Sequence, residues 1–220
     1  MPTTPVHLVP WLAPVVIALV AGCGAQLSKG EGRFEGGRFN FDWPDRAQVS
    51  SSDRSAFEDD VERSVDLLAV RLADTAIREA LVASNEQTLD LTLEDMLERD
   101  HRWQNSEPGD PFVASLINEP CSEVVMRFRR NYPQYVEIFV TNRSGLNVCQ
   151  TNKTTDYYQA DEGWWQATYK RTDTAPRLGA LEYDQSAGVY AVPAYLPIRD
   201  PASGLTIGVA KAVIKQANGE

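Results

Sequence analysis

The sequence is poor in the side chains from which catalytic and metal sites are usually built. It contains two histidines and three cysteines in 220 residues, and His101 is the only histidine beyond residue 22. A histidine-rich metal site is thereby excluded, and a histidine-based catalytic triad has little material. There is no CxxC motif and no glycine-rich phosphate loop. Because His101 lies in the charged run 98–102, we interpret it as a solvated helix end, and we predict no enzyme, no cofactor and no metal site.

Basic residues are scarce relative to acidic ones. The chain has 21 Lys and Arg against 31 Asp and Glu, which gives a net charge of -10. Phosphate binding needs clustered Lys and Arg, so a nucleic-acid partner is not expected. Adsorption on an anionic lipid surface is disfavoured for the same reason. The balance is typical of a solvated, soluble acidic surface.

A long apolar run is missing from the N-terminal segment. Residues 1–22 have no charged side chain and end in an apolar run over 15–20, shorter than the about 20 residues that a membrane-spanning helix needs. The run suits the core of a signal peptide. Val20-Ala21-Gly22-Cys23 resembles the bacterial lipobox. By this resemblance Cys23 receives lipid and becomes the first mature residue, and two or three acyl chains then hold the protein to a membrane.

The N-terminal segment leaves alternatives open. A signal peptide normally begins with Lys or Arg, whereas this one offers only the α-amino group and His7. The chain could instead be a soluble protein cleaved near Ala21, or keep an uncleaved anchor. Gly24 follows Cys23 without a signal for retention at an inner membrane, so the choice between inner and outer membrane stays open. Cys121 and Cys149 could form a disulfide in an exported chain, or each could be a buried small apolar residue.

The sequence predicts three segments: a signal peptide over 1–22, a lipidated tether over 23–53 and one domain over 54–216. The tether is rich in Gly, Ser and charge and has no apolar periodicity. Its aromatic residues leave open that part of it packs on the domain; they are Phe34, Phe39, Phe41 and Trp43.

The first half of the domain has helical signals. Apolar residues at four-residue spacing predict one long helix over 54–84, with a small shift before Ile77. Thr92 and Asp95 resemble a capping box that begins a helix to about residue 102. Asp110-Pro111 is typical of another helix start, and a further helix is predicted over 122–130.

The second half has strand signals. β-Branched and aromatic residues predict strands over 136–141, 146–151, 178–183, 188–198 and 205–215. A short helix is predicted over 164–170, and Gly- and Asp-containing turns join the last three strands as antiparallel neighbours. The order of elements predicts an α+β fold with a five-stranded antiparallel sheet, a long N-terminal helix and additional short helices.

Three stretches resemble the Cache superfamily of extracytoplasmic sensor domains. They are residues 138–145, residues 154–165, and residues 197–201 with Gly204 and 207–209. The resemblance spans about residues 54–215 and implies a PAS-like sheet whose concave face, closed by a Tyr/Trp loop, binds a small molecule. In the family this domain usually lies between two membrane helices of a kinase, chemoreceptor or cyclase.

The chain departs from the amino-acid-binding members of that family. Many of them carry Asp-Arg-Pro-Trp-Tyr where this chain has residues 161–165, so the family's carboxylate-binding arginine is replaced by Glu162. An aspartate late in their last strand is replaced by Val213. Recognition of an α-amino acid is therefore not expected. The sequence ends at Glu220, soon after the last predicted strand, so we expect any signal to pass to a separate protein.

The candidate ligand-binding site is an aromatic cluster with acidic neighbours. Asp161 and Glu162 beside two Trp could receive an amine, with cation–π attraction. Packing of Trp165 and Tyr169 on the sheet is the alternative. The aromatic members suit a small-molecule pocket and are Tyr157, Tyr158, Trp164, Trp165 and Tyr169.

Lys211 is a charge inside the otherwise apolar run 209–213. A buried lysine needs an acidic partner or a ligand anion, so Lys211 is a candidate anion contact of the pocket. The alternative is a lysine on a solvated face of the sheet.

The sequence thus supports two hypotheses of different class. The first is a lipid-anchored periplasmic sensor of the cell envelope, which binds a small molecule and signals to a separate kinase, cyclase or chemoreceptor. The alternative is a structural or interaction lipoprotein with a degenerate Cache fold that no longer binds a ligand.

Overall fold

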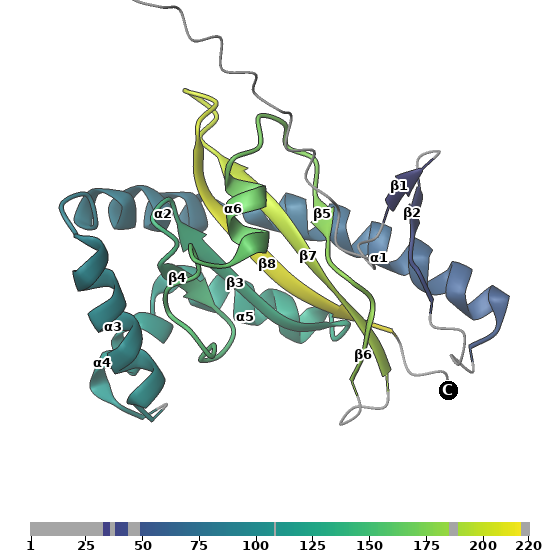
Figure 1. Ribbon diagram of the computed structural model, residues 1–220, viewed down its shortest axis with the longest axis horizontal. Coiled ribbons are helices and arrows are strands. Elements are labelled where there is room, and N and C mark those ends of the chain that lie inside the picture. The colour runs from purple at the N-terminus through teal and green to yellow at the C-terminus, as the bar shows by residue number, and fades with distance from the viewer. Residues whose placement is uncertain (1–32, 36–37, 44–48, 108, 185–188, 217–220) are drawn as a thin grey trace, which may run out of the picture.

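The computed structural model describes residues 33–35, 38–43, 49–107, 109–184 and 189–216 (Figure 1). The predicted signal peptide, the lipidation site at Cys23 and most of the predicted tether lie outside these residues. The helices are α1 (Ser51–Leu72), α2 (Thr75–Gln87), α3 (Leu93–Asn105), α4 (Pro111–Ile117), α5 (Pro120–Asn131) and α6 (Gly163–Tyr169). The strands are β1 (Arg33–Glu35), β2 (Arg38–Asn40), β3 (Tyr135–Asn142), β4 (Asn147–Gln150), β5 (Arg177–Leu178), β6 (Glu182–Asp184), β7 (Val189–Arg199) and β8 (Thr206–Lys215).

The main sheet is antiparallel with the order β4-β3-β8-β7-β5, and β6 also pairs with β7. β5 and β6 therefore share one edge position, and the predicted α+β class with a five-stranded antiparallel sheet is confirmed. The predicted strand 178–183 is broken into these two pieces. The break lies opposite Pro193, whose carbonyl accepts from the Gly179 N–H at 2.8 Å. Proline has no N–H to return to the edge strand, so the ladder is interrupted there.

The two faces of the sheet are covered differently. α1, α2 and α5 pack on one face, and alternate strand residues such as Ile138, Val140 and Ala212 enter the main core with them. α6 lies across β7 and β8 on the other face (Figure 1). α3 and α4 extend beyond one end of the sheet, where a smaller core contains Trp103, Val113, Leu146 and Tyr157.

The predicted helix over 54–84 is wrong as a single element. α1 ends at Leu72, and α2 begins after Asp74, whose carboxylate accepts from the Ala76 N–H at 3.0 Å. The five-residue step from Leu72 to Ile77 does not fit one continuous apolar stripe, so a break with a new N-cap lets both residues stay buried. The predicted helix starts at Thr92 and Asp110 are confirmed, each with its side-chain cap.

Part of the segment before α1 packs on the domain. Phe39 and Phe41 are buried in the main core, and Trp43 donates from Nε1 to Glu58 at 3.1 Å. α1 begins at Ser51, three residues before the predicted start, with Ser50 as N-cap. None of the helices within the described ranges combines the length and apolar character that crossing a bilayer requires.

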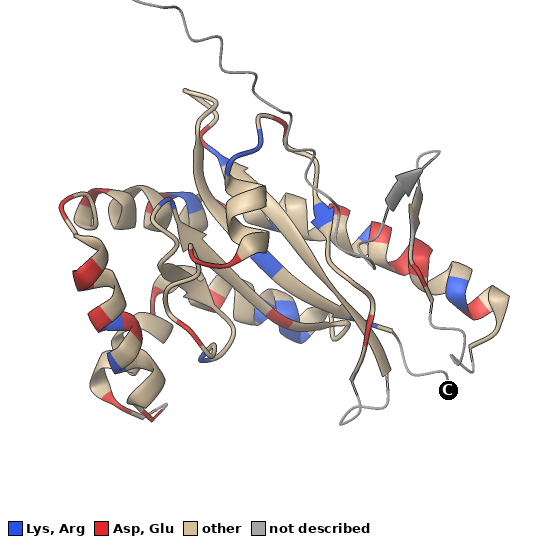
Figure 2. Cartoon of the chain, viewed as in Figure 1, with Lys and Arg blue, Asp and Glu red and all other residues tan. Residues whose placement is uncertain are grey.

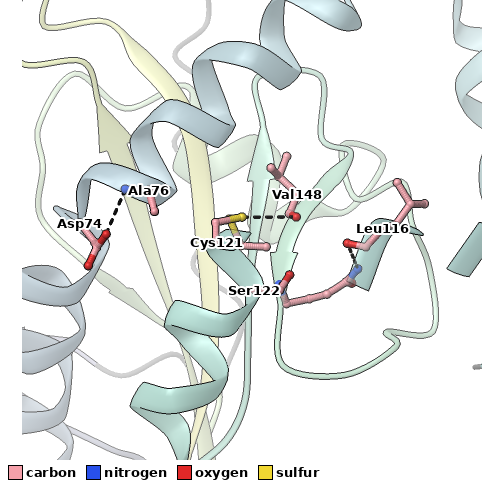
Figure 3. Close-up of a disulfide and its surroundings, with 8 residues drawn as sticks. Asp74, Ala76, Leu116, Cys121, Ser122 and Val148 are labelled. Atoms are coloured by element: carbon pink, nitrogen blue, oxygen red, sulfur yellow. Dashed lines mark hydrogen bonds between the residues drawn. A yellow bond between two sulfur atoms is a disulfide. The ribbon is translucent and has the colours of Figure 1, made fainter. Parts of the chain in front are cut away.

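A disulfide joins α5 to β4 (Figure 3). Cys121 and Cys149 are fully buried, and their Cα atoms are 5.3 Å apart. The adjacent Ser122 hydroxyl accepts from the Gln150 N–H at 3.1 Å. Of the two alternatives left open by the sequence, the structure has the disulfide.

Candidate ligand-binding site

The loop that follows β4 is held against α3 and the β3–β4 turn. The Asp100 carboxylate accepts from the backbone N–H groups of Tyr157 and Tyr158 at 2.6 and 3.0 Å. The Gln159 N–H donates to the Gly145 carbonyl at 2.8 Å. Trp103, fully buried, donates from Nε1 to the Thr154 carbonyl at 2.8 Å. These contacts fix the loop over the face of the sheet that α6 also covers.

A cavity of about 190 Å³ lies between this loop, α6 and the sheet. β3 and β8 provide its floor, where Phe139 is paired with Lys211 in the register of the two strands. The Trp164 ring from α6 forms one wall and stacks on Tyr195 of β7, with ring centroids 4.9 Å apart. The lining residues are Glu137, Phe139, Thr154, Thr155, Asp156, Gln159, Glu162, Trp164 and Lys211.

Lys211 is the cation among the described residues that line this cavity. Its Nζ lies 5.2 Å from the centroid of Trp164 and 5.6 Å from that of Phe139, and the side chain is half-buried. In the described part of the chain no carboxylate forms an ion pair with it. Aromatic faces attract an ammonium but do not replace a hydrogen-bond acceptor. The lysine therefore presents to the cavity a positive group that has no ion-pair partner among the described residues.

Carboxyl groups face the same space. Burial raises the pKa of the Asp156 carboxyl, and the nearby carboxylates of Asp100 and Asp161 raise it further. Gln104 donates to Asp156 at 2.9 Å and partly offsets this effect. Glu137, across the cavity floor, accepts from the Asn152 side chain at 3.2 Å. A ligand amine would relieve the unfavourable burial of Asp156.

The predicted site residues separate into different environments. Trp164 and Lys211 line the cavity, and the exposed Asp161 acts on it through its charge. Trp165 is buried beneath α6 and donates from Nε1 to Thr141 Oγ1 at 2.7 Å. Tyr169 stacks on Trp165 with centroids 4.6 Å apart and lines a different cleft.

The two remaining tyrosines belong to the smaller core. Tyr157 is buried against Trp103, with ring centroids 5.5 Å apart, and burial raises its phenol pKa to about 12. Tyr158 is half-buried and packs against the same cluster. Neither tyrosine lines the cavity beside Lys211.

Several lining residues were not predicted. Glu137 and Phe139 lie two residues apart on β3, so their side chains share a face, and a two-residue period along 136–141 could have found them. Thr154, Asp156 and Gln159 fall within the loop that resembles the Cache family, but nothing in their spacing distinguishes them from neighbours. Within the described residues no cluster of three His, Cys, Asp or Glu is arranged to hold a metal ion.

No family model matches the chain. No curated protein sequence matches it. Solved structures of sensor domains do match, among them the extracellular domain of vpHK1S-Z8, assigned as a histidine kinase. It is 8% identical with a TM-score of 0.41, and the match covers 74% of this chain and 53% of that one.

Two chemoreceptor structures are also similar. The ligand-binding domain of Pseudomonas aeruginosa PctC, solved in complex with GABA, is 18% identical with a TM-score of 0.32, covering 61% of this chain and 57% of that one. The sensory domain of Campylobacter jejuni Tlp3 with isoleucine bound is 16% identical with a TM-score of 0.34, covering 77% and 64%. The chain spans between half and two thirds of the length of these structures.

Proposed function

We propose that the chain is a non-enzymatic sensor protein that binds a small solute in the cavity between Lys211 and Trp164. The solute carries both an anionic group and an amine. Its anionic group contacts the Lys211 ammonium, its amine faces Asp156, and its body packs on the Trp164 ring. The observation that carries the proposal is the half-buried ammonium of Lys211, which faces a cavity without an ion-pair partner among the described residues.

A ligand anion would improve the surroundings of the half-buried Lys211 ammonium. Holding an ammonium away from bulk water costs free energy unless an acceptor replaces the lost hydration. Two aromatic faces supply part of the compensation, and a ligand carboxylate would supply charge-assisted hydrogen bonds. The volume of about 190 Å³ restricts the occupant to a small solute. Glu162, which stands where amino-acid-binding Cache domains carry an arginine, also lines the cavity and supports contact with a ligand amine.

The proposal extends to the cellular setting. The Val20-Ala21-Gly22-Cys23 sequence supports a lipid anchor on Cys23 and a periplasmic location in the cell envelope. The Cys121–Cys149 disulfide fits an oxidising compartment. The sequence resemblance to Cache domains supports a membrane partner that receives the signal, such as a kinase, cyclase or chemoreceptor. Mass spectrometry of the mature N-terminus tests the anchor, and an unmodified Cys23 would remove it from the proposal.

Ligand binding is tested by thermal shift with amines, carboxylates, zwitterions and purines, followed by calorimetry on the best compound. We expect a zwitterion to raise the melting temperature. Lys211→Met should weaken its binding about tenfold or more, because a charge-assisted contact is lost while the apolar stem is kept. Trp164→Ala should weaken it as well, through the loss of the stacking wall.

Lys215→Met is the matched control, since Lys215 lies on the same strand but does not line the cavity. Unchanged affinity in both Lys211→Met and Trp164→Ala would refute the placement of the site. If no compound stabilised the protein, the alternative of a structural or interaction lipoprotein would replace the sensor hypothesis.

A further inference from the structure

A second and larger cleft lies beyond the other end of α6. Its volume is about 600 Å³, and it is bordered by α2, the end of α6 and the tip of the β7–β8 hairpin. It shares no lining residue with the cavity beside Lys211. Trp164 at the start of α6 faces that first cavity, whereas Tyr169 at the end of α6 lines this cleft. The two spaces are therefore separate.

Exposed apolar side chains converge on the cleft. Leu205 at the hairpin tip is 68% exposed, Leu89 after α2 is 65% exposed, and Val82 on α2 is 44% exposed. Together with Ile207 they make most of the cleft wall apolar. Isolated apolar residues on a surface need no explanation, but three such residues around one concavity indicate a binding surface.

Arg143, Arg171 and Arg199 border the same cleft, although the chain as a whole is acidic. Figure 2 marks the positions of the basic and acidic residues along the chain. Arg199 donates to three backbone carbonyls, those of Gly204, Arg171 and Asp173, at 2.7 to 3.1 Å. Its Nε is buried and has no acceptor in the described residues. The guanidinium is thus fixed in place by backbone carbonyls, and although its charge also acts on the nearby Asp173 carboxylate, it adds positive potential to the cleft.

The other charged side chains around the cleft do not cancel this positive charge. Arg143 is exposed, and among the described residues its side chain donates only to the Asn85 carbonyl, at 3.5 Å. Arg171 is neutralised by a bidentate pair with Asp173, at 2.7 and 2.8 Å. Glu86 is the carboxylate that lines the cleft, and no ion pair joins it to Arg143 within the described ranges. Two guanidinium groups therefore face one carboxylate.

We propose that this cleft binds an amphipathic carboxylate, a small molecule with an acid group and an apolar chain. The carboxylate contacts the Arg143 and Arg199 guanidinium groups, because planar guanidinium groups match carboxylate geometry. The chain lies on Leu89, Leu205 and Val82, which removes their apolar surface from water. A volume near 600 Å³ lies in the ordinary range for small-molecule sites.

The experiment is calorimetric titration of the full mature chain with octanoate, octanamide and acetate. Octanoate should bind about tenfold or more tightly than either comparison compound, since octanamide lacks the charge and acetate lacks the chain. Arg143→Gln should reduce the preference for octanoate over octanamide several-fold, because Arg199 alone remains to contact the carboxylate. Leu205→Asn should reduce the preference for octanoate over acetate, because only Leu89 and Val82 remain to cover the chain. Both side chains are exposed, so neither substitution threatens the fold.

Arg130→Gln is the matched control, because Arg130 is an exposed arginine on α5, paired with Glu123. It should bind octanoate as the wild type does, and so should Lys211→Met, which affects the first cavity alone. Failure of the proposed carboxylate cleft is thereby distinguished from failure of the proposed solute site beside Lys211. The proposal is overturned if octanoate shows no saturable binding at millimolar concentrations, or if Arg143→Gln keeps the full preference. An acidic amphipathic peptide is titrated in the same way. If the peptide bound and octanoate did not, the proposal of a small-molecule ligand would be replaced by that of a protein partner.

Discussion

At the scale of single residues, two aspartates near the candidate sites have opposite electrostatic environments. Burial raises the pKa of Asp156, so the folded protein holds that proton more readily than the unfolded chain does. The ionised carboxylate then opposes folding at pH values above the folded pKa, and the effect is absent below the unfolded value of about 3.9. We expect Asp156→Asn to be more stable than the wild type at pH 7. The difference in melting temperature should shrink as the pH falls toward about 4.

Asp173→Asn provides the control with the opposite sign. Hydrogen bonding to the Arg171 side chain lowers the pKa of Asp173, so its ionised form supports folding above the unfolded pKa. That support is lost as the pH falls through the folded pKa. Asp173→Asn should therefore be less stable than the wild type at pH 7, with a gap that closes at low pH. A stability loss in Asp156→Asn at neutral pH would contradict the argument for that residue.

At the scale of elements, the β3–β4 turn holds the site loop through a close backbone approach. Gly145 has φ 82°, and a Cβ there would lie 2.5 Å from the Cβ of Ala160. Gly145→Ala should destabilise the protein by about 1–3 kcal/mol, because the left-handed backbone and the contact are both unfavourable. Urea unfolding measures the change. The variant should also weaken ligand binding beside Lys211, since the Gly145 carbonyl anchors the loop at Gln159.

A substitution at Gly204 separates the two causes of the stability loss expected for Gly145→Ala, the left-handed backbone and the contact with Ala160. It also has a positive φ, of 69°, but a Cβ there would meet nothing within 4 Å. Gly204→Ala therefore reports the backbone strain alone, and it should cost less stability than Gly145→Ala. Equal losses in the two variants would mean that the contact with Ala160 contributes nothing.

Residues of the short helix α6 line two separate spaces, the cavity beside Lys211 and the larger cleft. Successive residues on a helix are about 100° apart, so Trp164 faces the cavity beside Lys211 while Trp165 faces the sheet. Tyr169 stacks on Trp165 and lines the larger cleft. A shift of α6 on occupation of one space would therefore alter the wall of the other.

At the scale of the whole molecule, the disulfide limits the freedom of the unfolded chain. Cys121 and Cys149 are 28 residues apart, and closing a loop of this size stabilises a protein by about 3–4 kcal/mol in the chain-entropy account. The double variant Cys121→Ala with Cys149→Ala should lose about that much free energy of unfolding in urea. Reductant should destabilise the wild type by a similar amount and leave the double variant unchanged. Equal stability of oxidised and reduced wild type would contradict this prediction.

The amino-acid sequence by itself determined the α+β class and most of the elements in their order, but not the break between α1 and α2, the division of the edge strand into β5 and β6, or the strands β1 and β2. Caps such as those at Thr92 and Asp110, and the change from helical to two-residue periodicity near residue 135, depend on neighbours a few positions away. Local hydrogen bonding and side-chain periodicity suffice to specify them. The same local rules identified Lys211 as an unusual charge within an apolar strand, and Trp164 as part of an aromatic loop.

The tertiary structure alone decided which residues meet across long separations in the chain. Strand register pairs Lys211 with Phe139, and the packing of α6 brings Trp164 over both. It also buries Tyr157 in the smaller core and brings Cys121 to Cys149. Such contacts depend on how helices and strands pack at a distance, which no local pattern encodes. For that reason the sequence indicated a cluster of aromatic candidates, and only the fold separated the wall of the cavity from the core beneath it.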